Sequence, residues 1–515
     1  MAPVQVATSE TPQTVPQRNV ISLLVAGGSA LGIATVAERG LGFIANLAAA
    51  RIGGAPVFGA YSVAMTTANN IASYAGAGIG NTANRFSGDY PYGHSGYRGL
   101  LKALATVSLG SAALASVVLW FTAGPLAQHL LRNPALTPLL RLAAISAGVI
   151  ILLECLRGFL IGQRKFVALV AVCILSGGGL IAVLPLAASR GPSTMVIAQA
   201  SVALSAVAAC VLFARKLRLS PPANTGEDLG PRAAEVLRFG FVQLGSMIGL
   251  NAAGWWIASL VARADVTLVQ MALYSAAVQM RNMSAMPSWL ISQTAYAQLT
   301  EASGKQYGGP GRVTLLSTVL ATIIALMVAG PAAALMPWIV PHLYGKSFAG
   351  AELAASLAVI TGLVHMSGAP AANRLTVVSL RLTAIINTLW ALVVVGLGTW
   401  WLRGGGADQA IASFLAAHVF SALAVLVGLI SLSAAPRQLI QVSTPAVLAA
   451  ILLTYLAWLR SGSTHKAVLS LSMFAATLVF IGVAFVIGRR SCDSIRFLSI
   501  TDLLRMVLNR APAST

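Results

Sequence analysis

The stretch ARIGGAPVFGAYSVAMTTAN, residues 50–69, returns in altered form as ARADVTLVQMALYSAAVQMRN, residues 262–282. In both stretches Ala-Arg comes first, Tyr-Ser follows ten or eleven residues after the arginine, and an asparagine stands eight residues beyond the tyrosine. The first stretch follows the first long apolar segment of the chain, and the second follows the seventh. Copies that are six membrane spans apart have the same orientation, so the repeat predicts two lobes related by a pseudo-twofold axis along the membrane normal.

The composition is that of a membrane protein. Of 515 residues, 57% are hydrophobic and 9% are charged, whereas soluble domains carry about 25% charged residues. Apolar runs of about 20 residues can cross a membrane as helices. The sequence therefore predicts an all-α integral membrane protein with about fourteen transmembrane helices: two six-helix lobes plus two extra C-terminal spans. The expected spans are residues 20–48, 56–84, 99–124, 139–162, 167–188, 194–214, 239–262, 268–297, 313–336, 353–379, 382–402, 409–432, 443–459 and 467–488.

Basic residues are distributed unevenly between the two sides of these spans. The net charge is +20, from 33 Lys and Arg against 13 Asp and Glu. With the amino terminus in the cytoplasm, 20 basic residues fall in cytoplasmic segments, nine fall outside, among them Arg460, and four lie within spans. This bias is the usual topology signal, so both termini are predicted to be cytoplasmic. It explains the positive charge without nucleic acid as a partner.

Six segments follow from this pattern. We expect a cytoplasmic tail at 1–19, an N-lobe at 20–214, a cytoplasmic interlobe linker at 215–238, a C-lobe at 239–432, the last two spans at 433–490 and a cytoplasmic amphipathic tail at 491–515. The apolar face of the last tail favours a helix on the inner leaflet, with docking to a partner protein as the alternative. The four cysteines lack the spacing of a metal site or a disulfide framework, and we expect no cofactor.

Arg281 lies at the middle of the span at 268–297, with no acid within ten residues on either side. An arginine at the bilayer centre is unfavourable by roughly 2.5–3.5 kcal/mol on insertion scales, so such residues usually face a bundle interior or a water-filled cavity. At helical spacing Arg281 shares a stripe with Tyr274 and several serines. We expect it to face a hydrated cavity; pairing with an acid from another span is the alternative. Arg39 in the first span is a second cation, and two guanidinium groups favour an anionic ligand such as phosphate.

The seventh span carries Gln243, Asn251 and Trp255 at multiples of four. An indole stacks on the apolar face of a sugar, and amides hydrogen-bond hydroxyl groups. This stripe therefore favours a sugar-binding surface, while helix packing by the asparagine and an interfacial position of the tryptophan remain the alternative.

Glu38 and Glu154 are the acids within the spans, and either is a candidate site for a coupling proton or sodium ion. Glu154 stands three residues before Arg157, which favours a local ion pair. Arg374 lies seven residues before Arg381, so snorkelling to the inner surface explains it as well as a cavity does. His365 is interpreted as a helix-packing residue without a further role.

Two stretches, AARIGGAPVFGAYSVA at 49–64 and LYGKSFAGAELAASLAVI at 343–360, resemble the polysaccharide repeat-unit flippases (O-antigen and exopolysaccharide) of the multidrug/oligosaccharidyl-lipid/polysaccharide (MOP) exporter superfamily. The plan of an N-terminal lobe, a basic linker, a C-terminal lobe and a closing pair of spans is also similar, and the resemblance covers nearly the whole chain. Ala272-Leu273-Tyr274 departs from it, because the family usually has Gly-x-Tyr after the seventh span.

The resemblance implies a flippase that moves an undecaprenyl-diphosphate-linked oligosaccharide to the periplasmic leaflet of a bacterial inner membrane by alternating access, with no enzymatic reaction. It implies that Arg281 and Arg39 hold the diphosphate, and that the polyprenyl tail stays in lipid against a groove that the last two spans help to form. A polysaccharide polymerase and co-polymerase are further candidate partners. The residues implied for the sugar path are Trp255, Asn251, Gln243, Asn69, Asn70 and Tyr274.

Two other transporters share this fold. A peptidoglycan-precursor flippase also has fourteen spans and a basic cavity, so sequence alone barely excludes it. A cation-coupled multidrug exporter normally has twelve spans and needs acids in its cavity, whereas this chain has more arginine than acid within its spans. A polysaccharide polymerase or ligase is expected to act through a large periplasmic loop that is missing here, and a membrane scaffold needs no arginine at mid-depth.

Overall fold

The computed structural model describes residues 17–76, 78–216, 230–302, 310–403, 406–433 and 438–491. Every regular element in these ranges is a helix. The expected amphipathic tail lies outside the described residues, as do most of the N-terminal tail and of the interlobe linker. The helices are α1 Gln17–Ala75, α2 Ile79–Asp89, α3 Tyr97–Pro125, η1 Leu126–Leu130, η2 Pro134–Leu136, α4 Thr137–Gly162, α5 Phe166–Ala188, α6 Pro192–Lys216, α7 Ala233–Ala264, α8 Val269–Ala302, α9 Pro310–Tyr344, η3 Lys346–Phe348, α10 Glu352–Val378, α11 Leu380–Trp401, α12 Ala407–Ser431, α13 Gln438–Ser461 and α14 Lys466–Ser491.

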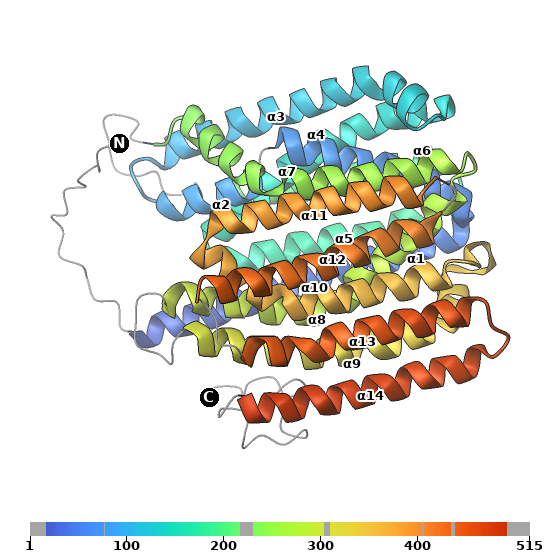
Figure 1. The fold of residues 1–515 in the computed structure, drawn as a ribbon. Coiled ribbons are helices and arrows are strands. Elements are labelled where there is room, and N and C mark those ends of the chain that lie inside the picture. The colour runs from blue at the N-terminus through green and yellow to red at the C-terminus, as the bar shows by residue number, and fades with distance from the viewer. Residues whose placement is uncertain are drawn as a thin grey trace.

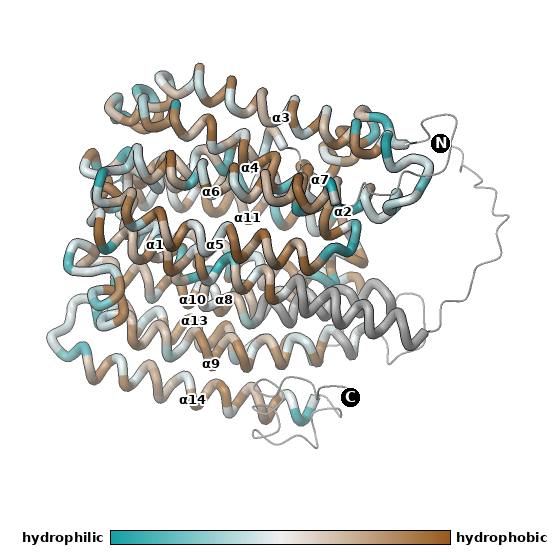
Figure 2. Tube along the Cα trace, turned by 180° about the vertical axis from the view of Figure 1, so that it is seen from behind, coloured by the Kyte–Doolittle hydropathy of each residue, from teal (hydrophilic) through white to brown (hydrophobic). Residues whose placement is uncertain are grey.

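Eleven helices in the described ranges are long and apolar enough to cross a membrane. α1 counts once among them although it contains two segments. The protein is therefore a multi-pass membrane protein, and the number fourteen stays a prediction. Figure 2 shows hydrophobic residues along the helices and hydrophilic ones gathered mainly at the two ends of the bundle.

Some boundaries differ from those expected. The first two spans are joined by a break at Gly54 (φ 74°) rather than by a loop, because glycine reaches this conformation and Pro56 starts a new segment. The expected second span is divided after Ala75, and α2 begins beyond Gly78 (φ 66°). α7 begins at Ala233, six residues before the expected span.

The long helices lie side by side in one bundle, with α3 at one edge and α14 at the other (Figure 1). Helices α1–α6 pack mainly on one another, as do α7–α12, and we call these sets the N-lobe and the C-lobe. α13 and α14 pack against α9, and α13 also contacts α10. α1 begins and α14 ends at the same end of the bundle, here named the terminal end; the opposite end is the far end.

The two repeat stretches contact each other at the far end. A side-chain carbon on Gly59 of α1 would lie 2.0 Å from the carbonyl oxygen of Leu268, so only glycine allows this approach. Phe58 packs edge-on against Phe348, with ring centroids 6.0 Å apart. Arg51 donates a hydrogen bond to the carbonyl oxygen of His342. These contacts join the lobes at the far end.

Arg460 does not lie in an outside loop, and that prediction was wrong. It occupies the last turn of α13, which runs two residues beyond the expected end, and it is 2% exposed. Its guanidinium donates to the Ala333 and Ala334 carbonyl oxygens at 3.1 and 2.8 Å. It also donates to the hydroxyls of Ser356 and Ser470 at 2.7 and 3.0 Å. These bonds satisfy the buried cation and tie α13 and α14 to α9 and α10.

Candidate functional site

The N-lobe contains an arginine between two carboxylates. Arg157 of α4 lies 2.6 Å from the Glu38 carboxylate of α1 and 3.3 Å from that of Glu154. The Cys173 thiol of α5 donates a hydrogen bond to Glu38 at 3.6 Å. The pair at i and i+3 is present as predicted, and Glu38 is a further partner that the sequence did not indicate.

Exposure ranks the members of this N-lobe cluster (Glu38, Arg157 and Glu154). The side chain of Arg157 is 12% exposed, that of Glu38 is 34% exposed and that of Glu154 is 54% exposed. Two ionised carboxylates around one guanidinium leave one negative charge. The more accessible Glu154 is thus the better placed of the two to exchange a cation or proton, and ion coupling through either glutamate stays a prediction.

Arg281 of α8 lies in the interior of the C-lobe. Within the described residues it has no ion pair with a carboxylate, so the alternative of a pairing with an acid finds no support there. Its guanidinium carbon lies 5.9 Å from the centre of the Phe414 ring, within the range of a cation–π contact. The absence of a side chain at Gly362 admits the arginine stem, because a side-chain carbon there would lie 3.4 Å from Cγ of Arg281.

Two histidines lie beside Arg281. The rings of His365 on α10 and His418 on α12 are 4.9 Å apart, and Trp390 of α11 packs edge-on against His418 at 5.3 Å. Phe414 contacts both Trp390, at 5.9 Å, and Tyr274, at 6.5 Å. We call Arg281, His365, His418, Tyr274, Phe414 and Trp390 the C-lobe cluster.

His365 has an unusual position on its helix. From Ala354 to Ala371 it is the one exposed side chain, and nearly all others are buried. α10 is packed by α8, α9, α12 and α13. A side chain exposed on so enclosed a helix opens onto a space between helices. The sequence could show that His365 turns away from Arg374, but not that α12 brings a second histidine to it.

The candidate sugar-path residues lie at the seam between the lobes. The Asn70 amide donates to the carbonyl oxygen of Asn251 at 2.9 Å, and the Trp255 indole donates to the hydroxyl of Thr67 at 3.3 Å. Asn69 is exposed beside them. The structure thus brings four of the six together. The side chain of Gln243 lies outside the described residues, and Tyr274 belongs to the C-lobe cluster instead.

The two remaining arginines differ in position. Arg39 is exposed on α1, one residue after the glutamate that pairs with Arg157. Arg374 is half-buried in the last two turns of α10, close to the terminal end. Nothing in the geometry joins Arg39 to Arg281 directly, and a shared diphosphate remains a prediction.

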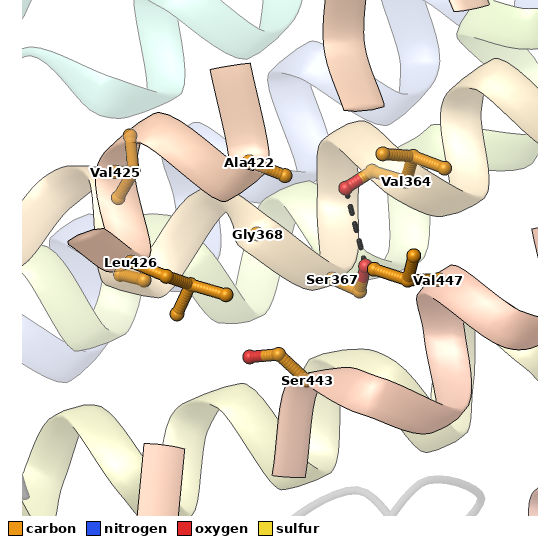
Figure 3. A pocket seen from close by; sticks show the side chains of 9 residues that line it. Val364, Ser367, Gly368, Ala422, Val425, Leu426, Ser443 and Val447 are labelled. Atoms are coloured by element: carbon orange, nitrogen blue, oxygen red, sulfur yellow. Dashed lines mark hydrogen bonds between the residues drawn. The ribbon is translucent and has the colours of Figure 1, made fainter. Parts of the chain in front are cut away.

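A small pocket of about 20 Å³ lies between α10, α12 and α13 (Figure 3). Small residues form much of its wall: Gly368 and Ala371 from α10, Ala422 from α12 and Ser443 from α13. Ala422 lies one turn after His418 on α12, so the pocket is adjacent to the C-lobe cluster. Apolar groups supply most of its lining.

Solved structures share this fold at low sequence identity. An inward-facing multidrug resistance MATE family transporter of the MOP superfamily has a TM-score of 0.60 at 15% identity, covering 79% of this chain and 98% of that chain. The lipid II flippase MurJ in an inward closed conformation has a TM-score of 0.59 at 14% identity, covering 89% and 98%. A MOP superfamily transporter from Pyrococcus furiosus, described as having a binding pocket of reverse polarity, has a TM-score of 0.57 at 14% identity, covering 80% and 96%.

The sequence itself matches one protein family. No curated protein sequence matches the chain. The profile of the polysaccharide biosynthesis protein family, in contrast, matches residues 24–296, which are more than half of the chain. Both repeat stretches lie within the matched residues. The chain therefore belongs to the polysaccharide biosynthesis protein family, and its fold is similar to that of MOP superfamily transporters.

Proposed function

We propose that the protein is a lipid-linked oligosaccharide flippase of a bacterial inner membrane. It moves undecaprenyl-diphosphate-bound polysaccharide repeat units from the cytoplasmic to the periplasmic leaflet by alternating access of its two lobes. The terminal end then faces the cytoplasm and the far end faces the periplasm. No bond is made or broken in this process, so the protein is proposed to have no enzymatic activity.

One observation supports an anionic substrate above all others. Arg281 lies at the middle of its helix, and within the described residues no carboxylate pairs with it. A cation in a low-dielectric interior is unfavourable unless it is neutralised. A diphosphate head group supplies that charge from outside, and a guanidinium binds phosphate oxygens through two parallel hydrogen bonds. Arg39 is the second proposed ligand.

Other parts of the substrate are proposed to lie at the lobe seam and against apolar residues. The asparagines and Trp255 at the lobe seam offer amide groups and an indole face to sugars. The apolar residues around the small pocket between α10, α12 and α13 are proposed to contact the polyprenyl tail. A charged head inside the bundle and a tail at its side agree with a substrate that stays anchored in lipid.

The other two transporters of this fold make different demands. A cation-coupled drug exporter needs available carboxylates, whereas both acids within these spans lie against Arg157, which offsets one of their two charges. A peptidoglycan-precursor flippase would also bind a diphosphate. The identity of the accumulating lipid therefore separates the two flippases.

The test is complementation of a deletion strain. Arg281→Ala should reduce export of the polymer by about 100-fold, the scale of one lost charge-assisted contact to an anion, and Arg281→Lys should retain part of it. The exposed Arg403→Ala is the matched control. Polymer is measured at the cell surface and lipid-linked sugars in the membrane, and an accumulating polysaccharide repeat unit supports the proposal. Normal export by a well-expressed Arg281→Ala would contradict it, and an accumulating peptidoglycan precursor or a change in drug sensitivity alone would point to the other transporters.

A further inference from the structure

The C-lobe cluster holds two titratable rings that an arginine-only binding site does not explain. His365 and His418 come from different helices, and their centroids are 4.9 Å apart. Both are near the middle of their helices, where a polar side chain is unfavourable unless it has a use. Apolar residues would fill the same space at lower cost.

The hydrogen bonding of His418 fixes which nitrogen is available. Its Nδ1 lies 2.7 Å from the carbonyl oxygen of Phe414. A carbonyl only accepts, so Nδ1 carries the hydrogen and Nε2 is the remaining nitrogen. In a neutral ring Nε2 presents a lone pair, which repels an anion; in a protonated ring it presents an N–H, which attracts one. An anion beside His418 therefore favours the imidazolium form.

The charges around the two rings have one sign. Arg281 faces them from α8, while α11 presents the uncharged Trp390. Tyr274 is the other titratable side chain on this part of α8. The acids of α10 and α12, Glu352 and Asp408, lie in the first turns of those helices at the far end. No carboxylate in the described residues of these helices is thus placed to balance a second positive charge at the cluster.

An anion bound to Arg281 changes this balance. It offsets the repulsion between the guanidinium and a protonated imidazole, and it accepts hydrogen bonds from both. A neighbouring anion favours the charged form of an imidazole, so it shifts the protonation of the two rings toward the imidazolium.

We propose that His365 and His418 take up protons when a diphosphate binds to Arg281, so that the C-lobe binds its substrate anion and protons together. This inference rests on the proposed function and names two further ligands and a pH dependence for the same site. By linkage, the affinity for the diphosphate rises as the pH falls, by about tenfold per pH unit for each proton taken up.

The test is calorimetry on the full-length purified protein with farnesyl diphosphate, a short polyprenyl diphosphate. Titrations near neutral pH in buffers of different ionisation enthalpy give the number of protons taken up on binding. His418→Asn keeps an amide donor near the Phe414 carbonyl and removes the titratable ring. His365→Gln likewise replaces the exposed ring of His365 with an amide that does not titrate. His465→Gln, in the exposed turn before α14, is the matched control. Protonation of the ligand itself is common to all variants and cancels in the differences.

The wild type and His465→Gln should take up about one to two protons more than the double variant, and each single variant should lie between them. The double variant should still bind, about tenfold more weakly, because Arg281 remains. Equal proton uptake by the wild type and a double variant that binds would overturn the histidine proposal and leave the flippase proposal intact. Absence of binding to the wild type would overturn both. If the double variant does not fold, the single variants decide the question by the same proton count.

Discussion

Each lobe encloses an arginine within its helices, and the surroundings of the two arginines differ in charge. In the N-lobe, Arg157 is held between Glu38 and Glu154, and the cluster is neutral or negative by itself. In the C-lobe, Arg281 lies among histidines and aromatic rings, with no carboxylate pairing with it in the described residues. Among the described residues, the arginine of the N-lobe thus has carboxylate partners and that of the C-lobe has none.

This difference in charge gives the two arginines different roles. The N-lobe ion pairs stabilise the packing of α1 on α4 and α5, and Glu154 is the more exposed of their two carboxylates. The C-lobe cluster is short of negative charge, so its favourable state is the one with an anion bound. Truncating the two arginines should therefore affect different properties.

Arg157→Ala should have the largest effect. It leaves two carboxylates beside each other without a cation, and breaking a largely buried ion pair destabilises a protein by about 3 kcal/mol. Thermal unfolding in detergent should show a clear loss of stability, together with a low yield from the membrane. Combining Arg157→Ala with Glu38→Gln should recover part of the loss, since one uncompensated charge is gone.

Arg281→Ala is the natural comparison in the same assay. It leaves no carboxylate unpaired among the described residues, so stability should stay close to that of the wild type while export is lost. Equal destabilisation by both substitutions would show that Arg281 is a structural cation like Arg157, and the contrast between the lobes would disappear.

Local patterns were enough to predict much of this comparison. Hydrophobic runs located the helices, the spacing of Glu154 and Arg157 predicted their pair, and the lack of nearby acids marked Arg281. What could not be predicted depends on side chains from distant parts of the chain. Glu38 reaches Arg157 only because α1 packs on α4, and His365 meets His418 only because α10 packs on α12.

The burial of Arg460 also could not be predicted from the sequence. In sequence it resembles a basic loop residue, since it stands before a Ser-Gly-Ser turn. Its burial depends on carbonyl groups of α9 and hydroxyl groups of α10 and α14 that converge in three dimensions. A count of charges along the chain cannot distinguish such a residue from an exposed one.

Asp265→Asn tests the comparison at the joints of the repeat, with a smaller effect. The N-lobe joint uses Gly54 and Pro56, whereas the C-lobe joint uses the Asp265 carboxylate, which accepts hydrogen bonds from the backbone of Thr267 and Gln270. Partial burial opposes ionisation, but these bonds, with that from the Thr267 hydroxyl, hold the pKa of Asp265 below its ordinary value. A lowered folded-state pKa stabilises the fold above the ordinary pKa, and this contribution is lost as the pH falls through the folded-state value.

At neutral pH, Asp265→Asn should therefore reduce stability by about 1 kcal/mol, the usual contribution of a helix cap. The difference from the wild type should shrink in strongly acidic buffer, which thermal unfolding across a pH series would measure. A difference independent of pH would mean that the carboxylate charge does not matter at this joint.

Arg374→Ala should have the smallest effect and limits the cationic site to one position. Arg374 lies on α10 like His365, but in the last two turns, close to the terminal end, where a long side chain can extend to the membrane surface. Removing an interfacial cation changes local electrostatics by less than about 1 kcal/mol, so export should fall by no more than about threefold. The same export assay, run beside Arg281→Ala, provides the measurement. If Arg374→Ala abolished export as completely as Arg281→Ala, the path of the anion would extend along α10 from the C-lobe cluster to the terminal end. The C-lobe cluster would then be one of several anion contacts rather than the binding site.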